Sequence, residues 1–545
     1  MNDCSSSVAG TALPRASRAT PTLPSVVNQK ECLPVVTKLR LKLLAASFAA
    51  WAAVSSASVV AEDRVFDVVA PFEIVGLDPS VSGFIFQRMQ VTETLLEADA
   101  DGQPIPALAE RWRVSEDGKT WHLTLRQGVT FHDGSALTAA AAAHALNVAR
   151  SKPGILRNAA ISAITAEGAD VVIQLDQPFA PLLSLLAHSS TSILAPAAYD
   201  AQDAVKAIIA TGPYRATLIE PPQRLKTERF EQYWGARPVI EKATYLGAGR
   251  GETRTLMAES GGAELVFQLD PPSIARLSRA QNVQVLTGPV PRVVMLAVNA
   301  GAGATASVEV RRALSLAMQR EGIAAAVLRA PGTAATQMFA ANVTAWHDPS
   351  LPPLHHDPEA AKALLKAQGW TPGSDGILEK NGERLHLKLL TFGDRPELAL
   401  IATALQAQLK EVGVEVEVAV ENLSAIPAAY HDGSLQLALF SRNYALVPDP
   451  LVTLYGDFGH GGAEWGPLGW KNPVFDQAMT ALLNSKAPAE QQALRHQMLA
   501  QVQSELPLIP VAWYRQSIAV SKDVEGAAID PFERTFGLST MRWAQ

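Results

Sequence analysis

Three polar residues suited to solute recognition follow an apolar run late in the chain. The run "LQLALF" ends at Phe440, and Arg442, Asn443 and Tyr444 come one residue later. A guanidinium can bind a carboxylate through two hydrogen bonds, and a phenol can stack or hydrogen-bond beside it. Because loops at strand ends often carry function, these residues indicate a site for a carboxylate-bearing solute. The alternative is structural, with Arg442 paired to Asp449 and Tyr444 packed in the core.

A Gly-Lys-Thr tripeptide, His132 and His144 lie between positions 118 and 144. A phosphate-binding loop would need a glycine five residues before Gly118, and Arg113 stands there. The segment "VSEDGKTWHLTLRQGVTF" instead predicts a tight turn followed by a half-buried strand. His132 then falls in a second turn and His144 in an Ala-rich helix capped by Thr138. Both histidines therefore favour a scaffold role over metal binding.

Other chemical motifs are sparse. The sequence contains no HExxH, no G-x-S-x-G and no complete phosphate-binding loop. His355 and His356 precede a predicted helix, either as a paired metal site or as surface residues. A Ser/His/Asp triad is recognised by geometry and not by sequence order, so a secreted hydrolase of small peptides or esters stays the alternative function. We expect a protein that is not an enzyme.

The N-terminal 61 residues have the pattern of an exported protein. Lys38, Arg40 and Lys42 precede an apolar run that ends in small residues, with Val59 and Ala61 at the positions before a cleavage site. The run is shorter than the roughly 20 residues that a membrane-spanning helix needs. We therefore expect residues 1–61 to be an N-terminal extension and signal peptide, and the mature protein to be periplasmic.

Cleavage after residue 61 would change the composition of the protein. Cys4 and Cys32 are its only cysteines, so the mature chain would have neither a disulfide nor a cysteine for lipid attachment. Removing six basic and two acidic residues takes the net charge from −7 to −11. This negative charge argues against nucleic acid as a partner.

The rest of the chain alternates helix and strand patterns. In "HDPEAAKALLKAQGW", Asp357 is the expected N-cap, Pro358 the first helical residue and Gly369 the stop, and the strand-like "LHLKLLTF" follows. A second helix is expected to end near Gly413, before another alternating strand. Repeated alternation of this kind predicts an α/β fold with helices packed on sheets. At 545 residues, the chain should form more than one lobe.

Several segments together resemble one protein family in their order along the chain. They are "LAERWRVSEDGKTWHLTLRQGVTFHDGSALTA", "ATGPYRA", "FEQYWGARPVIEKATY", "VMLAVN", "VRRALSLAMQREGI" and "HDPEAAKALLKAQGW". This set is similar to the extracytoplasmic solute-binding proteins of family 5, which serve ABC importers of peptides, nickel and opines, and is nearest the nickel-chelate subgroup. The resemblance spans residues 62–545.

The resemblance implies a two-lobe periplasmic binding protein fold of type II, from the large cluster with an extra subdomain. Lobe I would comprise residues 62–290 with a returning segment 511–545, and lobe II residues 291–510. The ligand cleft would lie between hinged lobes, and closure would remove the solute from water. The protein would then deliver a small solute, a short peptide or a metal chelate, to the permease subunits of an ABC transporter. The resemblance also implies a monomer.

The resemblance implies which residues meet the solute. The ligand-binding set would be Arg442, Asn443, Tyr444, Arg157, Ser189 and Trp465. His460 lies in the glycine-flanked loop "DFGHGGAEWG", where nickel-chelate relatives place a metal ligand. An arginine and two aromatic residues of those relatives are not matched here, and Arg157 is the expected substitute for the arginine. Nickel would thus arrive only as part of a bound chelate, with no cofactor of the protein itself.

Overall fold

The computed structural model describes residues 64–393, 395–444, 446–459, 465–485 and 487–545. The predicted signal peptide and His460 lie outside these residues. Among the described residues, no helix has the length and apolar character needed to cross a membrane. Contacts within residues 64–545 form one compact unit.

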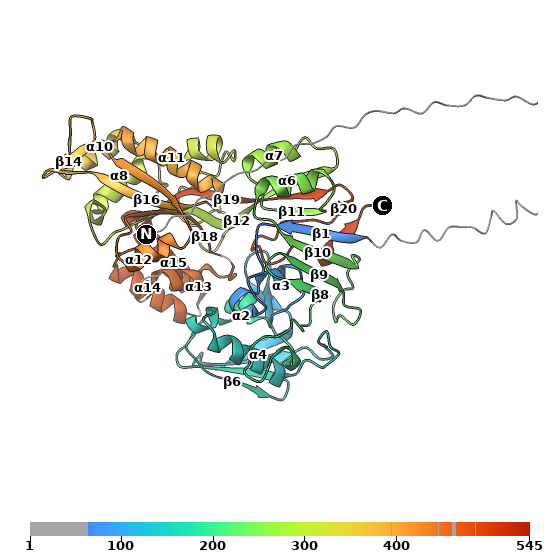
Figure 1. Cartoon of the computed structure of the whole chain (residues 1–545). Helices are drawn as coiled ribbons and strands as arrows, with labels where there is room; N and C mark the ends of the chain where they lie inside the picture. Colours follow the sequence, from blue (N-terminus) through green and yellow to red (C-terminus); the bar gives the residue numbers. More distant parts are fainter. Residues whose placement is uncertain (1–63, 394, 445, 460–464, 486) are drawn as a thin grey trace, which may run out of the picture. The chain divides into compact units, whose positions relative to one another are not determined.

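A ten-stranded mixed sheet runs through this unit (Figure 1). Its order is β17-β16-β18-β12-β19-β11-β1-β10-β9-β8. In chain order the strands are β1 (Val65–Ala70), β8 (Tyr214–Glu220), β9 (Arg224–Arg229), β10 (Lys242–Gly247), β11 (Leu265–Phe267), β12 (Val283–Val298), β16 (His386–Phe392), β17 (Glu415–Glu421), β18 (Leu437–Asn443) and β19 (Leu508–Ser521).

Strands β12 and β19 join the two halves of the sheet. β19 pairs with β11 at one end, β12 pairs with β18 at the other, and the two long strands pair with each other along most of their length. The register between them shifts between Pro289 and Val293, where two prolines interrupt the ladder. The sheet is therefore continuous across the predicted boundaries between lobes I and II, because the segments that cross these boundaries are themselves paired strands.

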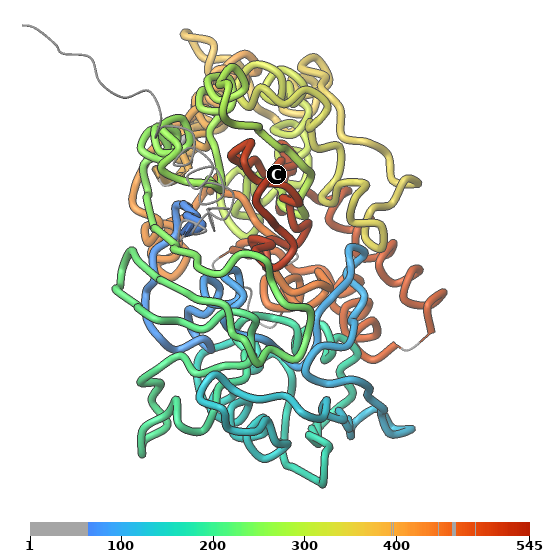
Figure 2. Tube along the Cα trace, turned by 90° about the vertical axis from the view of Figure 1, so that its right-hand side faces the viewer, coloured from blue at the N-terminus to red at the C-terminus, as the bar shows by residue number. Residues whose placement is uncertain are grey.

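A separate four-stranded antiparallel sheet has the order β4-β5-β7-β6. Its strands are β4 (Ala109–Val114), β5 (Thr120–Leu125), β6 (Ile161–Glu167) and β7 (Asp170–Leu175), and α4 (Ala139–Ser151) packs on β6 and β7. Figure 2 shows this part (cyan) at the opposite end from residues 300–390 (yellow). β4 and β5 form the hairpin predicted from the sequence, with Gly118 at a φ of 75° in its turn. Trp121, Leu123 and Leu125 are all buried, as the alternation predicts.

The helices begin where the capping signals predict. The Thr138 side chain accepts a hydrogen bond from the Ala141 amide to cap α4, and Asp357 caps α10 in the same way. The other helices are α2 (Pro79–Ser82), α3 (Phe84–Arg88), α5 (Leu182–Leu185), α6 (Gly251–Glu259), α7 (Pro271–Leu277), α8 (Val308–Ala317), α9 (Arg320–Gly322), α10 (Pro358–Ala367), α11 (Pro396–Glu411), α12 (Ala425–His431), α13 (Pro450–Phe458), α14 (Pro473–Asn484) and α15 (Pro488–Glu505). Short strand pairs complete the fold: β2 (Leu96–Ala98) with β3 (Pro104–Pro106), β14 (Leu378–Lys380) with β13 (Thr371–Pro372) and β15 (Glu383–Arg384), and β20 (Val524–Glu525) with β21 (Arg542–Trp543).

The two histidines expected to be part of the scaffold, His132 and His144, have structural partners. His132 Nε2 lies 2.9 Å from the Gly212 carbonyl oxygen, and its Nδ1 accepts a hydrogen bond from the Ala210 amide. Burial lowers the pKa of His132 to about 4, so it is neutral. His144 lies 3.0 Å from an Asp203 oxygen. Their predicted scaffold role agrees with these contacts.

Candidate functional site

A cavity of about 390 Å³ gathers charged side chains from distant parts of the chain. We call it the arginine cavity. It is lined by residues of α2 and α3, the loop before residues 155–158, the short helix at 189–191, β12 and the C-terminal segment. The lining residues used below are Phe72, Val81, Phe84, Arg88, Ile155, His188, Ser189, Ser190, Arg292, Leu446, Glu533 and Arg534.

The Glu533 carboxylate is the centre of the polar wall. Its side chain has no exposed surface, and its Oε2 accepts a hydrogen bond from Arg292 Nη2 at 2.8 Å. Asn443 Nδ2 donates to the same oxygen. The Glu533 backbone carbonyl accepts a hydrogen bond from Arg88 Nε at 2.7 Å. The backbone of Glu533 has a φ of 56°, which lies in the left-handed region. Non-glycine residues rarely adopt this conformation, and it is concentrated at functional sites.

Arg88 and Arg292 are buried guanidinium groups. Only 4% of Arg88 is exposed, and its guanidinium lies 4.6 Å from the Phe72 ring centroid and 5.3 Å from that of Phe84. Arg292 lies 5.1 Å from the ring centroid of Tyr514. Burial lowers the pKa of both arginines, yet the guanidinium starts so basic that both keep their charge. Aromatic faces partly compensate the loss of water around such cations.

Four atoms of the charged wall are buried without a hydrogen-bond partner in the part of the chain that the structure describes. They are Nη1 of Arg88, Nη1 of Arg292, Nε of Arg534 and Oε1 of Glu533. An unsatisfied buried polar group costs about 1–3 kcal/mol, so four together in one wall call for a functional explanation. Asp530 compensates Arg534, since an Oδ2–Nε distance of 3.9 Å joins them. The remaining charges, two guanidiniums against one carboxylate, leave a positive excess.

His188 and the serines after it form a neutral part of the wall. His188 Nδ1 accepts a hydrogen bond from the Ser190 amide and lies 2.9 Å from Ser190 Oγ. Burial lowers the pKa of His188 to about 4. Since Nδ1 is an acceptor, the neutral ring carries its proton on Nε2. Ser189, a predicted ligand residue, lines the cavity beside it.

The other predicted ligand residues lie in different surroundings. Asn443 contacts Glu533 and so supports the wall. Arg157 is exposed and lies two residues after Ile155, which lines the cavity. Tyr444 has no exposed surface and packs edge-on against Phe339. Trp465 packs edge-on against Phe392 and Phe440.

Arg442 pairs with a different carboxylate from the one considered in the sequence. Arg442 Nε donates to Asp457 Oδ2 at 2.8 Å, and its Nη2 donates to Oδ1 at 2.5 Å. The pairing with Asp449 was therefore wrong. Asp449 Oδ1 instead accepts from the Leu451 amide at the start of α13 and from Trp346 Nε1. Helix α13 brings Asp457 to the end of β18, and sequence distance alone does not show this.

Sequence reasoning missed Arg88, Arg292, Glu533 and Arg534. A signal exists for two of them, because Arg88 and Arg292 are single charges within the apolar segments "FIFQRM" and "VPRVVML". A lone charge at a buried position marks a functional or paired group. Glu533 and Arg534 stand in "DPFERTF", where only the fold brings them to the cavity.

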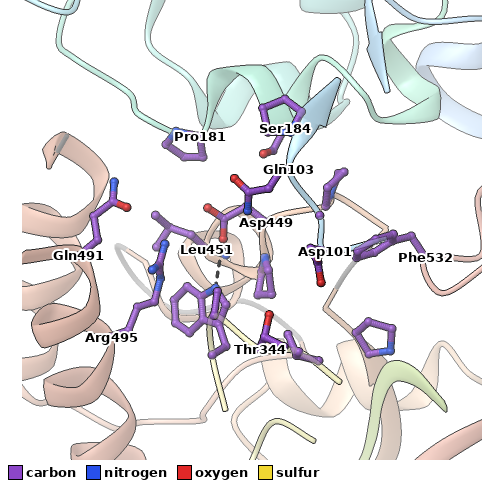
Figure 3. Close-up of a pocket in the computed structure, with 18 of the residues that line it drawn as sticks. Asp101, Gln103, Pro181, Ser184, Thr344, Asp449, Leu451, Gln491, Arg495 and Phe532 are labelled. Carbon is purple, nitrogen blue, oxygen red and sulfur yellow. Dashed lines mark hydrogen bonds between the residues drawn. The ribbon is translucent and has the colours of Figure 1, made fainter. Parts of the chain in front are cut away.

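A second cavity, of about 180 Å³, is lined by neighbouring residues of some of the same chain segments. Pro291, Pro448 and Phe532 line it, whereas their near neighbours Arg292, Leu446 and Glu533 line the arginine cavity. Figure 3 shows Gln103, Pro181 and Ser184 on one side and Asp449, Leu451 and Arg495 on the other. Two of its lining residues are joined by a hydrogen bond of 3.2 Å, which Trp346 Nε1 donates to Asp449 Oδ1. The Arg495 guanidinium lies 5.4 Å from the Trp346 ring centroid.

Comparison with known sequences decides the family. A sequence model described as "Bacterial extracellular solute-binding proteins, family 5 Middle" matches residues 103–465. The chain belongs to this family. The resemblance found in the sequence is thereby confirmed.

Relatives of family 5 match along most of the chain. The nickel-binding periplasmic protein of Escherichia coli K12 is 30% identical over 461 residues, which cover 80% of this chain and 86% of that protein. The glutathione-binding protein GsiB of Salmonella typhimurium is 26% identical over 503 residues, covering 90% of this chain and 95% of that protein.

The fold also agrees with a solved structure. NikA from Brucella suis in complex with Fe(III)-EDTA has a TM-score of 0.82 and 25% identity, and the match covers 88% of this chain and 100% of that one. The predicted α/β two-lobe binding-protein fold is therefore confirmed, as is the general function of a solute-binding protein for import. The named relatives are binding proteins.

Proposed function

We propose that this family 5 protein captures a small carboxylate-bearing solute in the arginine cavity. The observation that carries the proposal is the wall of Arg88, Arg292 and Arg534, in which three guanidinium nitrogens have no hydrogen-bond partner among the described residues. A carboxylate would accept hydrogen bonds from such nitrogens and neutralise the positive excess. Charge-assisted bonds of this kind are strong where water is excluded.

The relatives support this solute class. EDTA, the chelator bound to iron in the Brucella suis structure, is a polycarboxylate, and glutathione, named for GsiB, carries carboxylates. No cluster of three or more His, Cys, Asp or Glu side chains suited to a metal occurs among the described residues. We therefore propose that any nickel carried is part of the solute, held by a chelator with carboxylate groups. His460 is then an additional donor to that metal.

The proposed mechanism is binding, lobe closure and delivery, without covalent chemistry. Lobe I is residues 62–290 with 511–545, lobe II is residues 291–510, and the pairing of β12 with β19 supplies the hinge. The protein works as a monomer after export to the periplasm and cleavage behind Ala61, with no lipid anchor. Its partners are the permease subunits of an ABC importer.

The test is to purify the protein from a periplasmic extract and to identify what it retains by native mass spectrometry with elemental analysis. We expect a solute with at least one carboxylate, released on unfolding, and a more compact protein in small-angle scattering when the solute is bound. A purified protein that turns over peptide or ester substrates would refute the proposal. A retained solute with no acidic group would refute its chemistry.

A further inference from the structure

The wall of the arginine cavity contains an unsatisfied hydrogen-bond acceptor in addition to its unsatisfied donors. Oε1 of Glu533 has no hydrogen-bond partner among the residues described by the structure, while Oε2 of the same carboxylate accepts hydrogen bonds from Arg292 and Asn443. Because the Glu533 side chain has no exposed surface, water compensates Oε1 poorly. The wall thus contains two kinds of unsatisfied hydrogen-bonding group, donors on the arginines and an acceptor on Glu533.

Resting on the proposed function, we infer that the arginine cavity binds a carboxylate whose α-carbon carries a neutral N–H or O–H donor. The carboxylate meets the guanidiniums of Arg88 and Arg292, and the neutral donor meets Oε1 of Glu533. The carboxyl terminus of a peptide, an N-acyl amino acid and an α-hydroxy acid all have this arrangement.

The charge of the wall selects the neutral donor over an ammonium group. Near Glu533, two guanidiniums face one carboxylate, and the third guanidinium, that of Arg534, is compensated by Asp530. A single carboxylate on the solute brings this set to neutrality. An ammonium group on the neighbouring atom would restore the positive excess and would lie close to two like charges in a place of low dielectric.

The remaining lining suits an apolar substituent. Phe72, Phe84 and Ile155 line the cavity, and so do Val81 and Leu446, which are 60% and 38% exposed to solvent. Exposed apolar side chains at the rim of a cavity are typical of a ligand site. Leucine derivatives are therefore suitable probes, because their side chain matches these apolar residues.

The experiment compares three probes on the purified mature protein by isothermal titration and ligand-observed NMR. N-acetyl-L-leucine has the carboxylate and a neutral N–H, L-leucine has the carboxylate and an ammonium, and N-acetyl-L-leucine methyl ester has no carboxylate. We expect N-acetyl-L-leucine to bind roughly tenfold or more tightly than L-leucine, and the ester not to bind. Equal or tighter binding of L-leucine, binding of the ester, or no binding of N-acetyl-L-leucine would each overturn the inference.

Variants then locate the binding. Arg292→Gln should weaken N-acetyl-L-leucine binding roughly tenfold or more, since one charge-assisted contact is lost. The matched control is Arg276→Gln, an arginine of α7 whose partner is the surface residue Glu259. Unchanged affinity in a folded Arg292→Gln variant overturns the inference, and if that variant does not fold, the probe series on the natural chain decides. A protein that retains a periplasmic carboxylate solute but ignores N-acetyl-L-leucine keeps the proposed function and loses only this headgroup.

Discussion

Removal of Arg442 should destabilise the protein through the carboxylate that it leaves behind. Asp457 is 2% exposed and its two oxygens are both paired with Arg442, whose own side chain is 30% exposed. Removing one partner of a buried pair costs about 3–5 kcal/mol, and the partial exposure of Arg442 puts the expected loss near the lower end, at about 3 kcal/mol. The substitution is Arg442→Ala, and the measurement is the free energy of unfolding by urea titration.

The pH dependence of this loss identifies its cause. Burial raises the pKa of Asp457, and the attraction of Arg442 opposes that rise. Without Arg442 the pKa rises further, so the variant gains stability relative to the natural protein as the pH falls and Asp457 takes up a proton. Adding Asp457→Asn to the Arg442→Ala variant should recover much of the loss at neutral pH.

The control and the refuting results are specific. Arg276→Ala breaks an exposed ion pair and should cost less than about 1 kcal/mol. An Arg442→Ala variant no less stable than this control would refute the argument from the buried carboxylate. If it also bound the retained solute more weakly, the ligand role predicted from the sequence would hold instead.

Three other sites give simpler tests. Burial raises the pKa of Glu93 to about 7. Because the folded protein holds this proton more tightly than the unfolded chain does, the stabilisation is fully present below the unfolded pKa and is lost as the pH rises through about 7. Between pH ~4 and pH ~8, the unfolding free energy of the natural chain should therefore fall by about 2–3 kcal/mol more than that of the Glu93→Gln variant. Gly212→Ala should lower the melting temperature and cost about 2 kcal/mol or more, because the added Cβ would collide with the Gln90 carbonyl oxygen; a variant as stable as the natural chain would contradict this close approach. If His460 binds the metal of a nickel–histidine complex, the affinity in titration calorimetry should drop as the pH falls through about 6.5, and His460→Ala should be both weaker and insensitive to pH over that range.

Local structure followed closely from local sequence. The hairpin around Gly118, the helix capped by Thr138 and the helix begun by Asp357 and Pro358 all form as predicted. Each depends on hydrogen bonds and backbone angles within a few residues of the signal, and these are written directly in the chain. The order of the family-like segments also indicated the family, which the comparisons confirm.

The residues of the candidate site were much harder to predict from the sequence. Of the six described residues predicted to meet the solute, Ser189 lines the arginine cavity and Asn443 supports its wall. Tyr444 follows a strand, which suggested either contact with the solute or packing in the core, and its ring is buried. A strand end is visible in the sequence, whereas the layer that covers it comes from residues far away.

The sequence by itself therefore indicated the α/β class, several individual helices and strands, the family and the general function of solute binding. The tertiary structure decided which charges meet. Arg88, Arg292 and Glu533 are separated by 204 and 241 positions in the chain, and only the pairing of β12 with its neighbours and the return of the C-terminal segment bring them into one wall. Short-range signals fix local backbone geometry, but the energy of a buried charge depends on every group around it, so a site made from distant residues is settled only when the chain has folded.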